Sequence, residues 1–129
     1  TEIEATLATA HGTYAGRRIV AAFQPHLFSR TRDLHAEFGR ALAAADVVWV
    51  TDVYPAREAP IEGVTGELVS RAAESAGNRN VRFVATLDDL ARALRDELRD
   101  GDVLVAMGAG DIDEMAHALH DGFARESHR

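Results

Sequence analysis

The sequence predicts an α/β protein with a doubly wound, mainly parallel sheet and helices on both faces, in a Rossmann-like arrangement. Short apolar runs of strand length alternate with longer segments of helical spacing along the chain. Parallel strands require long crossover connections, and this alternation supplies them. The 129 residues are 47% hydrophobic, which suits one well-cored domain and is too little chain for two. We therefore expect a single domain over residues 1–129.

Four short runs rich in β-branched or aromatic residues are the predicted strands. Most of them are apolar throughout instead of alternating with polar residues, which is typical of parallel strands buried on both faces. They are Ile19–Phe23, Val47–Val50, Val81–Val84 and Val103–Met107.

The first two helices are predicted from apolar residues spaced three and four apart. One covers about Thr1 to His11, where Glu2 and Glu4 favour the positive end of the helix dipole. The second begins near Ser29 or Thr31. Its apolar face is formed by Leu34, Phe38 and Leu42.

Polar caps predict where the other three helices begin. Thr65 is the expected N-cap of a helix that ends at Gly77. Thr86 and Asp89, three residues apart, have the spacing of a capping box for the next helix. Asp111 and Glu114 give the same signal for the last helix, and Gly122 is its predicted end.

Composition excludes several classes of function. The formal charge of −7 opposes nucleic-acid binding, which depends on Lys and Arg at the phosphates. All 14 basic residues are arginine, so a P-loop lysine is missing and the chain holds no complete P-loop ATP site. Without cysteine there is no thiolate catalysis and no Cys-based zinc site. The sequence shows neither an apolar run long enough to span a membrane nor a leader typical of exported proteins, so we expect a cytoplasmic protein.

The segment from Gln24 to Arg32 leaves the first predicted strand and enters a helix. Arginine offers a planar pair of donors, and the start of a helix carries partial positive charge, so Arg30 and Arg32 there suit a carboxylate or a phosphate. His26 adds a group that donates, accepts or transfers protons near neutral pH. The alternative is an ordinary loop with two solvated arginines.

The segment after the second strand, residues 51–60, is stiffened by two prolines. Its acidic side chains can hold the ammonium group of an amino acid, with Tyr54 as the wall of the pocket. The alternative is structural: Asp52 caps a turn, and Arg57 and Glu58 are solvated.

Two glycines follow the last strand. Backbone N–H groups at Gly108 and Gly110 can approach an anion such as phosphate, or these residues can simply form a tight turn into the last helix. His117 and His120 lie three residues apart in that helix, but no third ligand has suitable spacing. We therefore expect no metal site.

Three of these segments resemble motifs of one enzyme family. Residues 23–33 read F-Q-P-H-L-F-S-R-T-R-D and resemble the F-Q-P-H-x-[FY]-[ST]-R-T-R-D signature of UDP-N-acetylmuramate–L-alanine ligases, which are Mur ligases. Residues 52–61 are similar to the family's D-V-Y-P-A-x-E-x-P-I segment, and residues 108–112 resemble its G-A-G-[DN]-I turn. Residues 1–3 are similar to the end of its H-H-P-T-E-[IV] motif. The resemblance extends along the whole chain.

The resemblance implies that residues 1–129 are the C-terminal domain of a three-domain ligase of peptidoglycan synthesis. In that family, an N-terminal domain holds UDP-N-acetylmuramate, and a central P-loop domain holds ATP and magnesium. ATP phosphorylates the muramoyl carboxylate, and the amine of L-alanine attacks the acyl phosphate to give an amide. The chain begins inside the H-H-P-T-E motif, so we expect the other two domains to lie outside it and this chain alone to be inactive.

The resemblance also implies roles for individual residues. His26 and Arg30 match motif positions that face L-alanine and the reacting carboxyl group. Tyr54 and Glu58 occupy motif positions near the same pocket. Leu27 stands where many relatives have arginine, so one anion contact of those relatives is missing here or supplied elsewhere.

Two other interpretations compete with the ligase domain. One is a free-standing, non-catalytic α/β module that binds a small carboxylated or phosphorylated ligand. The other is a purely structural interaction domain, which fits the acidic charge but leaves the arginines at the helix start unexplained. The pair of motifs after the first two strands favours the ligase domain.

Overall fold

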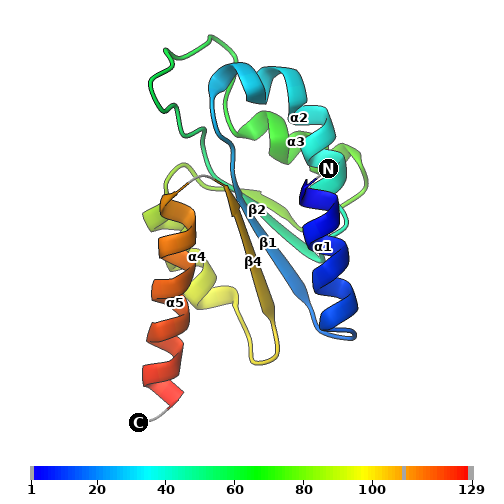
Figure 1. Ribbon diagram of the computed structural model, residues 1–129, viewed down its shortest axis with the longest axis vertical. Coiled ribbons are helices and arrows are strands. Elements are labelled where there is room, and N and C mark those ends of the chain that lie inside the picture. The colour runs from blue at the N-terminus through cyan, green and yellow to red at the C-terminus, as the bar shows by residue number, and fades with distance from the viewer. Residues whose placement is uncertain (1, 109, 128–129) are drawn as a thin grey trace.

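The computed structural model describes residues 2–108 and 110–127 as one sheet between two layers of helices (Figure 1). The elements alternate along the chain, as the sequence predicts. The helices are α1 (Glu2–Thr13), α2 (Phe28–Leu42), α3 (Glu67–Ser75), α4 (Leu87–Glu97) and α5 (Asp111–Ser127). The strands are β1 (Ile19–Gln24), β2 (Val47–Val50), β3 (Val81–Phe83) and β4 (Val103–Gly108).

The four strands are parallel and lie in the order β3-β2-β1-β4. The chain therefore builds outward from β1 to β3 and then crosses to the other side of β1 to form β4. This reversal confirms the doubly wound topology. The predicted strand β2 has the observed bounds, β1 and β4 are each one residue longer than predicted, and β3 ends one residue earlier.

Each face of the sheet carries its own apolar core. Successive side chains of a strand point to opposite faces of the sheet. In β1, Ile19 and Ala21 therefore lie in one core, while Val20 and Ala22 lie in the other. On the first side α1, α2 and α3 cover the sheet, with Leu7, Leu42 and Val69 fully buried. The second side is covered by α4 and α5. Their buried residues there are Leu90, Leu94, Ile112 and Leu119.

Helix α2 begins at Phe28, slightly before the predicted start, and α4 begins where expected. The Thr86 side chain accepts a hydrogen bond from the Asp89 backbone N–H at 3.1 Å, as an N-cap should. In α3 the cap position is Gly66, while the Thr65 hydroxyl accepts from the Glu67 N–H at 3.2 Å. The predicted N-cap is therefore displaced by one residue.

The predicted end of the last helix at Gly122 is wrong, because α5 continues to Ser127. A glycine ends a helix when it takes a left-handed backbone conformation, as Gly77 does with φ +107° after α3. Gly122 stays helical, and the next residue, Phe123, packs against the core under α4 and α5. This apolar contact favours continuing the helix over ending it.

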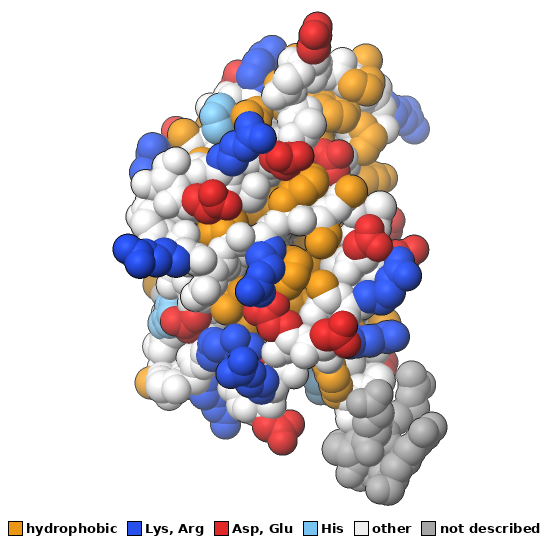
Figure 2. All heavy atoms as spheres, turned by 180° about the vertical axis from the view of Figure 1, so that it is seen from behind, with side chains coloured by type: hydrophobic (Ala, Val, Ile, Leu, Met, Phe, Trp, Pro, Cys, Tyr) orange, Lys and Arg blue, Asp and Glu red, His pale blue; other side chains and the backbone are white. Residues whose placement is uncertain are grey.

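The surface mixes both signs of charge. Seen from behind, basic and acidic side chains are interspersed instead of gathered by sign (Figure 2). Among the described residues, no helix is both long and apolar enough to cross a membrane.

Candidate functional site

His26 and Tyr54 lie together beyond the carboxyl ends of β1 and β2. Their backbones form a short parallel bridge, in which the Tyr54 N–H donates to Pro25 O at 2.8 Å and the Leu27 N–H donates to Tyr54 O at 2.9 Å. The two rings stack with centroids 5.9 Å apart and planes 18° from parallel. The structure thus joins the two segments in which the sequence predicts binding residues.

Leu27 connects this bridge to helix α2 through an unusual backbone conformation. Its φ is +67° and its ψ is +135°, a region that L-residues rarely occupy and that costs on the order of 1–3 kcal/mol. Its carbonyl accepts from the Thr31 N–H at 3.1 Å and from the Thr31 hydroxyl at 2.8 Å. Contacts on both sides of Leu27 hold this conformation in place.

The carboxylate of Glu58 lies at the N-terminus of α2. One oxygen accepts from the Ser29 backbone N–H at 2.7 Å, and the other accepts from the Ser29 hydroxyl at 2.5 Å. The Ser29 hydroxyl, the Ser29 and Phe28 N–H groups and the charge of Arg32 together lower the pKa of Glu58. The N-terminus of α2, where the sequence predicts binding of an external anion, therefore already binds a carboxylate of this chain.

Arg30 is exposed on the first turn of α2 and makes no ion pair within the described part of the chain. Arg32 instead pairs with Asp33 at 2.9 Å, and both are exposed. Of the two arginines predicted as an anion site, Arg30 is the one whose guanidinium is available.

The carboxyl ends of β1 and β4 meet where the order of the sheet reverses. Gln24, the last residue of β1, pairs with Gly108, the last residue of β4. A Cβ at Gly108 would lie 2.8 Å from Gln24 O and 3.1 Å from Gln24 Cβ, so only glycine fits this place. Gly108 and Gly110 both have positive φ, at +147° and +80°, while Ala109 between them lies outside the described residues.

Sequence reasoning did not single out Gln24. Its side chain is 8% exposed, and among the described residues its Oε1 has no hydrogen-bond partner. Such a group is costly to bury unless something pairs with it. The only signal in the sequence is a polar residue at the end of an apolar strand.

Asp52, also considered as a contact for an ammonium group, has a structural role. Its Oδ1 accepts from the N–H groups of Val53 at 2.8 Å and Gly66 at 3.0 Å. These bonds tie the end of β2 to the start of α3. The alternative in which Asp52 caps a turn is therefore the one observed.

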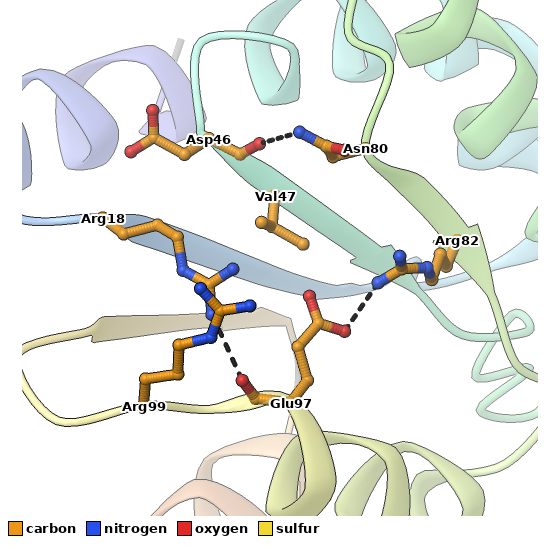
Figure 3. Close-up of a pocket in the computed structure, with 7 residues that line it drawn as sticks. All are labelled: Arg18, Asp46, Val47, Asn80, Arg82, Glu97 and Arg99. Atoms are coloured by element: carbon orange, nitrogen blue, oxygen red, sulfur yellow. Dashed lines mark hydrogen bonds and ion pairs between the residues drawn. The ribbon is translucent and has the colours of Figure 1, made fainter.

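A polar cavity of about 360 Å³ lies at the opposite, amino-terminal edge of the sheet, where the sequence predicts no site (Figure 3). Arg82 bonds to Glu97 at 2.6 Å across it, and Arg18 donates to the backbone carbonyl of Glu97 at 3.2 Å. Arg18, Arg82 and Glu97 thus have partners within the fold. The cavity is lined by Arg18, Asp46, Val47, Asn80, Arg82, Glu97 and Arg99.

The ion pair of Arg18 and Asp102 beside this cavity predicts an acid-sensitive contribution to stability. Two hydrogen bonds, at 3.0 and 2.6 Å, join the guanidinium to both carboxylate oxygens, and the Asp102 side chain is 7% exposed. The bond from Arg18 is the main cause that lowers the pKa of Asp102, aided by the Arg99 backbone N–H. Since the folded pKa lies below the unfolded value of about 3.9, this contribution is full above about pH 5 and is lost as pH falls through the folded pKa.

Asp102→Asn is accordingly expected to lower the free energy of unfolding by about 1–2 kcal/mol at pH 7, because a charged hydrogen-bond pair is lost. Urea titrations at pH 7 and pH 3 measure it, and the difference between wild type and variant should shrink at the lower pH. Asp100→Asn, exposed on the same turn, is the control. An equal difference at both pH values would contradict the ion-pair explanation.

The fold is that of a doubly wound α/β domain, in which ligands generally bind beyond the carboxyl ends of the strands at the switch point, and this point lies between β1 and β4 here. Comparison with known proteins identifies the family. The Mur ligase, glutamate ligase domain family matches residues 1–110. The chain belongs to this family.

Individual relatives point to the same family. The chain is 54% identical over 113 residues to a UDP-N-acetylmuramate–L-alanine ligase from Cutibacterium acnes, covering 87% of this chain and 24% of that protein. The enzyme of the same name from Pelodictyon phaeoclathratiforme is 47% identical over 128 residues, or 98% of this chain and 26% of the relative. The chain thus spans about a quarter of the length of these relatives.

Solved structures show the same fold. The crystal structure of the UDP-N-acetylmuramate-alanine ligase from Thermotoga maritima aligns with 97% of this chain and 24% of its own, with a TM-score of 0.75 and 27% identity. A domain of a putative ligase from Haemophilus ducreyi aligns with 92% of this chain at a TM-score of 0.62 and 18% identity, which supports the fold alone.

Proposed function

We propose that this chain is the C-terminal, amino-acid-binding domain of an ATP-dependent ligase that joins L-alanine to UDP-N-acetylmuramate in peptidoglycan synthesis. The observation that carries the proposal is the 54% identity to a ligase of that name, which spans most of the chain. The stacked pair of His26 and Tyr54 at the carboxyl edge of the sheet, with Arg30 exposed on the first turn of the adjoining helix α2, supports it, because ligands of doubly wound folds bind there.

In this proposal His26, Tyr54 and Arg30 bind and orient L-alanine. Arg30 bonds to the carboxylate of the amino acid, since its guanidinium is exposed and unpaired within the described chain. His26, stacked on Tyr54, faces the amine and the reacting carboxyl group. Gly108 and Gly110 let backbone N–H groups approach a phosphate at the switch point.

ATP and magnesium are proposed to bind mainly to other parts of the ligase. The chain contains no lysine, so the P-loop residue that contacts the β- and γ-phosphates must come from elsewhere. ATP supplies the activation of the muramoyl carboxyl group, and this domain supplies the amine in a fixed position. We further propose that the ligase acts in the cytoplasm and has neither nucleic acid nor membrane as a partner, given the charge of −7.

A chimera tests the proposal. In it, this chain replaces the matched segment of the Cutibacterium acnes ligase, and phosphate release is measured with ATP, magnesium, UDP-N-acetylmuramate and L-alanine. We expect turnover that depends on L-alanine from the chimera and none from the isolated chain, which lacks a P-loop lysine. Turnover by the isolated chain, or a folded chimera that ignores L-alanine, would contradict the proposal.

A further inference from the structure

Residues 51–60, here called the β2 loop, are attached to the start of α2 at two places. The first is the backbone bridge between Tyr54 and the residues on either side of His26. The second is the Glu58 carboxylate, with one oxygen 2.7 Å from the Ser29 nitrogen and the other 2.5 Å from the Ser29 hydroxyl. Between these attachments the loop turns, and the Glu58 N–H donates to Pro55 O at 2.9 Å. The attachments lie on either side of the strained residue Leu27.

The second attachment uses the strongest anion-binding feature of the helix. The first N–H groups of a helix have no partner within the helix and lie at the positive end of its dipole. Glu58 accepts from one of these groups, the Ser29 N–H, and from the Ser29 hydroxyl, while the Phe28 N–H also helps to lower the pKa of Glu58. Because both carboxylate oxygens are engaged, Glu58 is poorly placed to hold the ammonium group of a ligand at the same time.

We propose that Glu58 is a positioning residue for L-alanine binding and not a residue that contacts L-alanine. It fixes Tyr54 against His26 and holds the first turn of α2, so that Arg30 points out from a rigid base. This inference rests on the proposed function and replaces the direct binding role that the sequence suggests for Glu58.

The backbone of Leu27 supports this role. A non-glycine residue keeps a φ of +67° only when its surroundings over-determine it. The bridge at Tyr54 holds one side of Leu27, and the Glu58 carboxylate holds the helix turn on the other side. Loss of Glu58 frees that turn, so Leu27 can relax and change the angle between His26 and Arg30.

The isolated chain tests the attachment without any ligase activity. Amide hydrogen exchange of Ser29 and Phe28 is measured in wild type, in Glu58→Ala and in Glu62→Ala, an exposed glutamate four residues further on. We expect faster exchange in Glu58→Ala alone, and slower exchange again when acetate is added, because acetate can occupy the vacated place. Unchanged exchange in Glu58→Ala would overturn the attachment.

The chimera tests the positioning role through a double-mutant cycle of Glu58→Ala and Ser29→Ala. We expect each variant to raise KM for L-alanine, with Glu58→Ala raising it about tenfold, and the double variant to behave like Glu58→Ala alone. Acetate should lower the raised KM of Glu58→Ala. Failure of the proposed function itself is seen separately, as lack of L-alanine-dependent turnover in the chimera without substitutions.

Two outcomes overturn the inference while the proposed function stands. Additive effects of Glu58→Ala and Ser29→Ala on KM would show that Glu58 acts on L-alanine directly and not through Ser29. An unchanged KM in Glu58→Ala, despite faster exchange at Ser29, would show that the attachment does not position the site. If Glu58→Ala fails to fold, Glu58→Gln in the same cycle keeps the side chain's size and removes its charge, and the same two outcomes apply.

Discussion

Replacing Arg30 by alanine in the chimeric ligase is expected to lower kcat/KM for L-alanine about ten- to a hundredfold. A hydrogen bond from a charged group to a carboxylate contributes about 1.5–3 kcal/mol, and each 1.4 kcal/mol corresponds to about tenfold. The N–H groups of the helix end bind Glu58, so they cannot replace the lost guanidinium. Steady-state kinetics with varied L-alanine measures the effect.

Arg40→Ala is the matched control for this prediction. Arg40 is exposed on the same helix, ten residues further on and therefore roughly 15 Å along its axis. Its loss is expected to change kcat/KM very little, as exposed single charges usually do. Arg30→Lys separates charge from geometry, because lysine keeps the charge but lacks the planar pair of donors. Equal effects of the two alanine variants would mean that Arg30 is only a solvated arginine.

Most of the fold could be predicted from the sequence because its signals are local. Short, mostly apolar runs predict the four strands within one residue at each end, and of these β1 and β2 are buried while β3 and β4 are largely half-buried. The start of α2 lies one residue before Ser29, the earlier of its two predicted positions, and the end of α5 was predicted wrongly, because distant contacts decide both. Glu58 supplies the cap that lets α2 begin at Phe28, and packing of Phe123 extends α5 past Gly122.

The candidate site was predictable in its location but not in its contacts. Segments that follow parallel strands collect at one edge, so the bridge between His26 and Tyr54 agrees with the expected convergence. Nothing local in the sequence shows that Glu58 bonds to Ser29, 29 residues away. The pair of Arg18 and Asp102, 84 residues apart, was missed for the same reason. Whether the clustered residues bind L-alanine stays a prediction.

The position of α2 is also fixed by α3, because the two helices pack closely against each other. Gly39 is buried in α2 at this contact, and a Cβ there would collide with the Cβ of Ala72. The same Cβ would lie 2.6 Å from the backbone carbon of Ala72 and from the nitrogen of Ala73. Backbone atoms cannot turn away as a flexible side chain can, so the two helices must separate to admit one methyl group.

Gly39→Ala is therefore expected to lower the free energy of unfolding by about 1–3 kcal/mol, although alanine is the better helix former by about 1 kcal/mol. Gly12→Ala is the matched control: Gly12 also lies in a helix, but a Cβ there meets nothing within 4 Å. That variant should be neutral or up to about 1 kcal/mol more stable. Thermal and urea unfolding of the isolated chain measure both. If Gly39→Ala is as stable as the wild type or more stable, α2 and α3 are not packed as tightly as the structure shows.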